Sequence, residues 1–137
     1  MAALKHVVID TNVIVSSMLS SRLSPPVSIM NLVANEMLTV CYDERIWEEY
    51  VDVLYRPHFK FDPWGVKTIL HSIKSAGFLV NPPAHEVVLP DPNDQAFYEV
   101  ADLCLCPLIT GNQRHFPVEP HIMTPAEFIE SLRERQN

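Results

Sequence analysis

The sequence has little glycine, few cysteines and few basic residues, and each shortage excludes a class of protein. Only three of the 137 residues are glycine, and none stands in a loop that would cradle a phosphate or a dinucleotide. The odd number of three cysteines argues against a disulfide framework, and their spacing does not match a zinc site. We therefore expect reduced, buried thiols. Ten basic residues against 17 acidic ones give a formal net charge of −7, which argues against a coat protein for nucleic acid.

Long apolar runs are absent as well. No stretch approaches the length that spans a bilayer, and the first apolar run is interrupted at once by Asp10, so we expect no signal peptide. We therefore expect a cytoplasmic protein with no membrane partner. The apolar share of 47% and the charged share of 20% are ordinary for a folded protein, and the length predicts a single domain over residues 1–137.

Short apolar strands alternate with amphipathic helices along the whole chain. Strands are predicted at residues 6–10, 38–42, 78–81, 105–110 and 121–123. Helices are predicted at residues 12–21, 25–37, 44–56, 63–77 and 92–104, and from residue 125 onward. This alternation predicts an α/β domain with a mainly parallel sheet, whose functional crevice lies beyond the carboxyl ends of the strands.

Asp10 ends the first predicted strand and therefore falls at that edge. Two roles are open for it. The Asp10 carboxylate or the Thr11 hydroxyl could cap the helix that follows. Alternatively, Asp10 is an acid of the functional crevice.

The helix at 44–56 contributes the next acids. Asp52 points away from the apolar stripe of this helix, which predicts a solvated side chain. Glu49 lies closer to the stripe, one turn after Ile46 and one turn before Val53, which favours Glu49 over Glu48 as an acid aimed toward the crevice. An ordinary exposed glutamate is the alternative.

Asp94 shares a helical face with Phe97 and Ala101. An acid on a buried face is costly unless it is hydrogen-bonded, paired or metal-bound. Alternatively, Asp94 only places a favourable negative charge in the first turn of its helix. Asp91 is the better candidate for capping that helix, which leaves Asp94 free for another role. Asn112, after the strand that ends near Thr110, is either a turn residue or a ligand that offers its amide oxygen to a hydrated cation.

A cluster of such acids calls for cations, because carboxylates without a counter-charge repel one another. Mg²⁺ and Mn²⁺ prefer oxygen ligands and are held by a few carboxylates plus the phosphate oxygens of a substrate. One cation can lower the pKa of an attacking water, and a second can stabilise the leaving oxygen.

The chain resembles the PIN domain family, and is most similar to the branch described as toxin components of bacterial toxin–antitoxin systems. The resemblance covers nearly the whole chain, in segments 8–13, 48–54, 56–59, 91–94, 110–112 and 123–128. It implies a three-layer α/β/α fold with a mainly parallel, roughly five-stranded twisted sheet. It also implies hydrolysis of RNA phosphodiester bonds with Mg²⁺ or Mn²⁺.

Carried over residue by residue, the resemblance gives Asp10, Glu49 and Asp94 as the first three family acids, with Glu48 as a second register for the glutamate. Asp10 and Asp94 would hold the metal, and Glu49 would assist or orient the water. Asn112 falls where many members have a fourth Asp, and would position a water at the metal. An Asn there lowers the negative charge, which implies weaker binding of a second metal and a slow or inactive enzyme.

Five further residues are secondary candidates from the same segments. Thr11 and Thr110 would add hydroxyl hydrogen bonds, and Arg114 would meet a phosphate unless it is a solvated surface residue. Asn12 and Asp91 belong to the same motifs. The resemblance also implies a homodimer and a cognate antitoxin whose segment enters the acidic groove.

Two alternatives remain at this point. The first is a catalytically weak or inactive PIN domain that acts as a binding or regulatory module, which Asn112 and the acidic surface favour. The second is a phosphatase of the haloacid dehalogenase type. That enzyme requires an Asp two residues after the first acid, where this chain has Asn12, and a Lys just before Asp91, where this chain has none.

Overall fold

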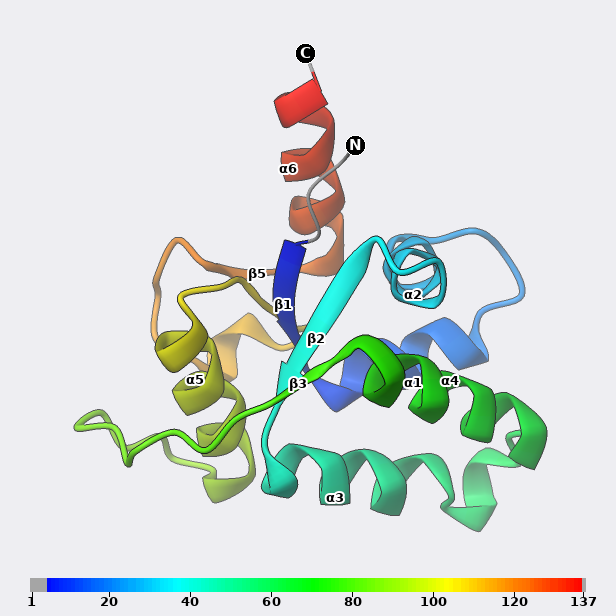
Figure 1. The fold of residues 1–137 in the computed structure, drawn as a ribbon, viewed down its shortest axis with the longest axis horizontal. Coiled ribbons are helices and arrows are strands. Elements are labelled where there is room, and N and C mark those ends of the chain that lie inside the picture. The colour runs from blue at the N-terminus through cyan, green and yellow to red at the C-terminus, as the bar shows by residue number, and fades with distance from the viewer. Residues whose placement is uncertain (1–4, 137) are drawn as a thin grey trace.

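The computed structural model describes residues 5–136, which form a five-stranded, all-parallel sheet with helices packed around it (Figure 1). The strands are β1 (Lys5–Ile9), β2 (Leu38–Tyr42), β3 (Phe78–Leu79), β4 (Leu108–Ile109) and β5 (Ile122–Met123). The α-helices are α1 (Thr11–Leu19), α2 (Pro25–Ala34), α3 (Glu44–Leu54), α4 (Pro63–Ala76), α5 (Pro92–Cys104) and α6 (Pro125–Gln136). Two 3₁₀ turns are η1 (Pro57–Phe59) and η2 (Gln113–His115). The predicted three-layer α/β/α fold is confirmed.

Side chains cap the starts of most of the helices. The side chains of four cap residues accept hydrogen bonds from backbone N–H groups of the first turn, namely Ser24, Asp43, Asp62 and Asp91. In α6 the backbone N–H of Thr124 donates to Glu127 and the N–H of Glu127 donates back to the Thr124 hydroxyl, which is a complete capping box. These caps fix where each helix leaves the sheet edge.

Several predicted boundaries differ from the structure. The helix expected at 25–37 ends at Ala34, and the strand expected at 78–81 contains only Phe78 and Leu79. The strand expected at residues 105–110 contains only Leu108 and Ile109, because Leu105 adopts a left-handed conformation (φ 50°) that ends α5 and Pro107 cannot donate to a ladder. A glycine is required directly after α4, because a Cβ at Gly77 would lie 2.2 Å from the carbonyl oxygen of Ile73.

The order of the strands places a functional crevice. The sheet runs β3-β2-β1-β4-β5, so the chain builds outward from β1 in one direction and then crosses to its other side. The order therefore reverses between β1 and β4, and ligands in such sheets bind at the carboxyl ends of the strands at this switch point. In Figure 1, α3 lies below the carboxyl ends of β1 and β2, with α5 on one side of these strands and α2 and α4 on the other.

The core lies between these layers, with β2 buried along its whole length. Its largest fully buried side chains include Tyr50, Phe97 and Phe128. Cys41 and Cys106 are buried and Cys104 is half-buried, all as free thiols. Among residues 5–136, no helix is long and apolar enough to cross a membrane.

Candidate active site

Asp10 follows β1 directly at the switch point. It occupies the N-cap position of α1, but its side chain makes no capping hydrogen bond. Its Oδ2 instead accepts hydrogen bonds from Thr110 Oγ1 at 2.8 Å and from Asn12 Nδ2 at 3.2 Å. The side chains that hold Asp10 thus come from the segments that follow the two strands of the switch point, Asn12 after β1 and Thr110 after β4.

Glu49 reaches the same place from α3. The buried stripe of this helix, which includes Ile46 and Tyr50, sets its rotation, and the Tyr50 hydroxyl donates to the carbonyl oxygen of Ile9 at the end of β1. Glu49 is half-buried, and its Oε2 accepts a hydrogen bond from the Thr11 hydroxyl. Glu48 is exposed, so of the two registers only Glu49 lies beside Thr11.

Asp94 is the third acid and lies in the first turn of α5. Asp91 caps this helix by accepting from the N–H of Asn93, which leaves the Asp94 side chain without a capping task. Asp94 is 9% exposed, and its buried Oδ2 has no hydrogen-bond partner. Nδ1 of His115 lies 3.5 Å from the same oxygen. A buried carboxylate oxygen without a donor is costly, and such an oxygen is available to a cation.

The segment after β4 encloses the site. Thr110 is fully buried, and its hydroxyl both donates to Asp10 and accepts from the N–H of Asn112. The N–H of Gly111 donates to Asn12 Oδ1 at 3.0 Å, and a Cβ at Gly111 would lie 3.3 Å from that oxygen. The side chain of Asn112 is exposed at the start of η2. Asn112 therefore lies beside the acids but is not packed among them.

The three acids raise one another's pKa. Burial is the largest cause for each. The pKa of Asp10 is raised by burial and by the charge of Asp94, against the hydrogen bond from Thr110. The pKa of Glu49 is raised by burial and by the charges of Asp10 and Asp91, against the hydrogen bond from Thr11.

The pKa of Asp94 is likewise raised by burial, then by the charges of Asp91 and Glu49, while His115 opposes the rise. Three acids that all resist ionisation mark a site that lacks positive charge, and such clusters are typical of functional sites.

The donor set fits a divalent cation of the hard type. All the candidate ligands are oxygens, and one of them, Asp94 Oδ2, is buried without a donor. In the described part of the chain, no three side chains of His, Cys, Asp and Glu form a ready metal-binding group. Mg²⁺ does not require three, because it is commonly held by one or two carboxylates together with water and substrate phosphate.

Comparison with known proteins places this site in a family. A family model described as PIN domain matches residues 6–114, a span that contains Asp10, Glu49, Asp94 and Asn112. The chain belongs to the PIN domain family. No curated protein and no solved structure matched the chain. PIN domains are typically nucleases, and PIN nucleases generally use divalent metals.

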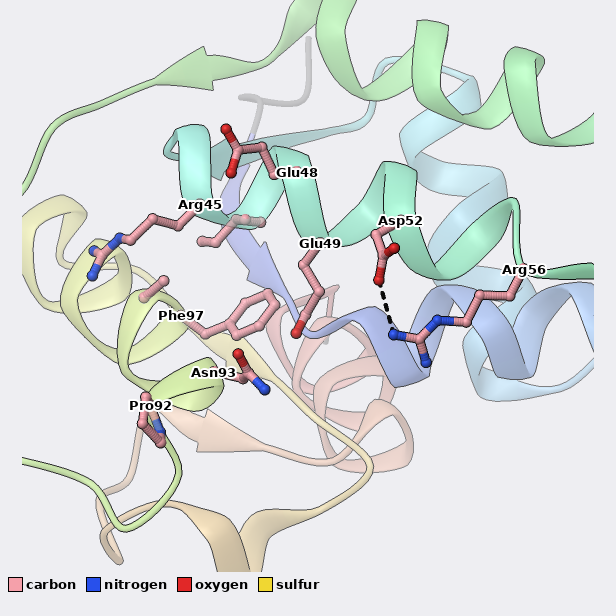
Figure 2. A pocket seen from close by; sticks show the side chains of 10 residues that line it. Arg45, Glu48, Glu49, Asp52, Arg56, Pro92, Asn93 and Phe97 are labelled. Atoms are coloured by element: carbon pink, nitrogen blue, oxygen red, sulfur yellow. Dashed lines mark hydrogen bonds and ion pairs between the residues drawn. The ribbon is translucent and has the colours of Figure 1, made fainter.

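A groove of about 380 Å³ lies between α3 and α5 of this PIN domain, and Glu49 is the one acid of the three that lines it. In Figure 2 the side chain of Glu49 points into it, with Arg45 at one end, the pair Asp52 and Arg56 at the other, and Asn93 across from Glu49. The groove is therefore a polar, mixed-charge channel that opens onto one of the three acids.

Three contacts of the PIN domain were not predicted from the sequence. His115 approaches Asp94, and Glu99, on the buried part of α5, accepts hydrogen bonds from Arg45 on α3 and from the N–H of His85. All three depend on which helices and loops meet, and the sequence pattern does not give that. The predicted secondary candidates Asp91 and Arg114 are exposed, and only Asp91 has an assigned task, as the cap of α5.

Proposed function

We propose that this PIN domain is a metal-dependent ribonuclease that hydrolyses phosphodiester bonds of RNA. The observation that supports it best is the buried, unpartnered Oδ2 of Asp94 in a group of acids that also contains Asp10 and Glu49. A cation supplied to this group would offset the charges that raise the three pKa values. We propose that the domain extends over residues 1–137.

Asp10 and Asp94 would hold the cation, which could be Mg²⁺ or Mn²⁺. When bound, such a cation lowers the pKa of an attacking water and offsets charge on the phosphate. Thr110 fixes the orientation of Asp10 through its hydrogen bond, and Thr11 does the same for Glu49. Glu49 is placed to accept a proton at Oε1 while Oε2 remains bonded to Thr11. Asn112 would position a water at the rim.

The biological setting proposed here is that of a toxin in a toxin–antitoxin pair, acting in the cytoplasm. Its partners would be RNA, an antitoxin protein and a second copy of the chain in a homodimer. A module that binds RNA or protein without cleaving it is the second candidate. The exposed Asn112, in place of an acid, supports that candidate because it leaves the site with three acids.

Cleavage of a labelled single-stranded RNA of mixed sequence tests the proposal. The purified protein is incubated with Mg²⁺, with Mn²⁺ or with EDTA, beside the variants Asp10→Asn and Asp94→Asn. Asp102→Asn, an exposed acid of the same helix as Asp94, is the matched control. We expect cleavage by the unmodified protein and the control only when metal is present. Cleavage that survives in both site variants would contradict the proposal, and RNA binding without cleavage would favour the module.

A further inference from the structure

Two arginines, Arg45 and Arg56, line the groove between α3 and α5, and they differ in how buried their ion-pair partners are. Arg45 donates through Nε to Asp43 at 2.8 Å and through a terminal nitrogen to Glu99 at 2.9 Å. The carboxylates of Asp43 and Glu99 are both buried, with side-chain exposures of 6% and 5%. Arg45 is therefore committed to holding α3 against α5.

Arg56, at the opposite end of the groove, forms only an exposed ion pair. It donates to Asp52 at 2.8 Å, one turn earlier on α3, and the side-chain exposures of the two residues are 49% and 70%. Exposed ion pairs of this kind contribute little, because water screens both charges. The charge of Arg56 also reaches the acids, since it lowers the pKa of Glu49 against the effect of burial. Arg56 is thus a forked cation near the acid site that a stronger anion can capture.

We propose that Arg56 binds a non-scissile phosphate of a single-stranded RNA that lies in the groove between α3 and α5. This inference rests on the proposed function, since it assigns the substrate class of the same site. The guanidinium group fits a phosphate with two parallel hydrogen bonds, and the phosphate displaces Asp52 from it. Figure 2 shows the Arg56 side chain beside Asp52, and Arg56 lies just after the C-terminal end of α3, the helix that carries Glu49 and Asp52.

The burial of the acids favours single-stranded RNA over a duplex as the substrate. Asp10 and Asp94 are 7% and 9% exposed, so a scissile phosphate must enter a recess to reach them. A single strand can bend into such a recess and track a groove, whereas a duplex presents a stiff backbone. With a net charge of −7, the protein as a whole repels RNA, so a local cation at the mouth of the site carries much of the attraction.

The test measures RNA binding apart from cleavage. All proteins carry Asp94→Asn, which keeps the RNA intact whether or not the unmodified protein is a nuclease. Fluorescence anisotropy with a labelled single-stranded RNA of mixed sequence is recorded in Mg²⁺ over a range of salt concentrations. Arg56→Gln is compared with the matched control Arg133→Gln, an exposed arginine of α6 that also pairs with an acid on its own helix. Asp52→Asn is the variant expected to act in the opposite direction.

Arg56→Gln is expected to weaken binding about tenfold and to reduce the slope of log affinity against log salt by about 0.7, the value for one phosphate contact of a single strand. Asp52→Asn is expected to tighten binding, and Arg133→Gln to leave both quantities unchanged. Equal losses from Arg56→Gln and Arg133→Gln, or no loss from either, would overturn the inference. An Arg56-dependent loss of the same size with a duplex of the same sequence would overturn its single-strand part.

This experiment separates the inference from the proposed nuclease. Arg56-dependent binding with no cleavage by the unmodified protein would leave the subsite standing and reject the ribonuclease. Metal-dependent cleavage together with RNA binding that does not change in Arg56→Gln would support the ribonuclease and reject the Arg56 subsite.

Discussion

Thr110 Oγ1 donates a hydrogen bond of 2.8 Å to Oδ2 of Asp10, which joins two residues that are 100 positions apart in the chain. The contact exists because β1 and β4 are neighbours in the sheet, with Ile9 paired to Ile109. Thr110 is fully buried, so water cannot replace its hydroxyl. The hydrogen bond therefore fixes the direction of the Asp10 carboxylate at the switch point of the sheet.

The Thr110→Val variant tests this orienting role. Valine keeps the shape but leaves Asp10 without its buried donor, and hydrogen-bond partners that orient a metal-binding side chain are worth about 10- to 100-fold in metal affinity or activity. We expect Mn²⁺ affinity and RNA cleavage to fall by that range. Thr110→Ser, which keeps the hydroxyl, should retain most of both. Equal losses in the two variants would mean that packing of the methyl group, not the hydrogen bond, is responsible.

Stability without metal should depend on pH through Asp10. Its pKa is raised in the folded protein by burial, so between the ordinary carboxyl pKa near 4 and the raised value the folded state holds more protons than the unfolded chain. The contribution of Asp10 to the free energy of unfolding is thus most favourable below this window and is lost as the pH rises through it. Urea unfolding in EDTA at pH 4 to 7 measures the effect.

Relative to the unmodified protein, Asp10→Asn should gain stability on the order of 1 kcal/mol as the pH rises across this range. Glu48→Gln, at an exposed acid next to Glu49, is the control and should run parallel to the unmodified protein. If the difference in free energy of unfolding between Asp10→Asn and the unmodified protein stays constant with pH, the raised pKa of Asp10 is not the cause of the pH dependence.

Glu99 should matter for stability more than any surface acid. It accepts hydrogen bonds from Arg45, from Gln95 and from the N–H of His85 at 2.9, 3.1 and 2.7 Å, and these outweigh burial and lower its pKa. Glu99→Ala would break all three hydrogen bonds and would leave Arg45 with Asp43 as its remaining partner, so we expect a loss of about 2–3 kcal/mol in chemical unfolding.

Glu130→Ala, at an exposed acid paired with Arg133, is the control for Glu99→Ala and should cost less than about 0.5 kcal/mol. A small loss in both variants would show that the Arg45–Glu99 contact is dispensable.

Much of the fold was predictable because its signals are local. Capping residues such as Asp43 and Asp91 sit immediately before their helices, and the spacing of Ile46, Tyr50 and Leu54 repeats with the helical period. The start of β4 was less predictable. Leu105 takes a left-handed conformation that a leucine rarely adopts, and no local signal announces it.

The site was predictable only in part. Asp10, Glu49 and Asp94 became candidates because each is an acid beside an apolar pattern, which is visible in a single element, and the resemblance to the PIN domain family selected these three. The approach of His115 to Asp94 depends on where η2 lies, and the bonds of Glu99 depend on how α3, α5 and the loop around His85 meet. Such contacts follow from tertiary packing, so periodicity and spacing do not contain them.

Isothermal titration with Mn²⁺ is the most direct test of the central claim, that Asp10, Glu49 and Asp94 form a cation site. The unmodified protein is compared with Asp10→Asn and Asp94→Asn, with Glu48→Gln as the control that removes a neighbouring charge outside the site. We predict binding by the unmodified protein and the control, and its loss in both site variants. No binding by the unmodified protein, or binding that all four proteins share, would contradict the claim.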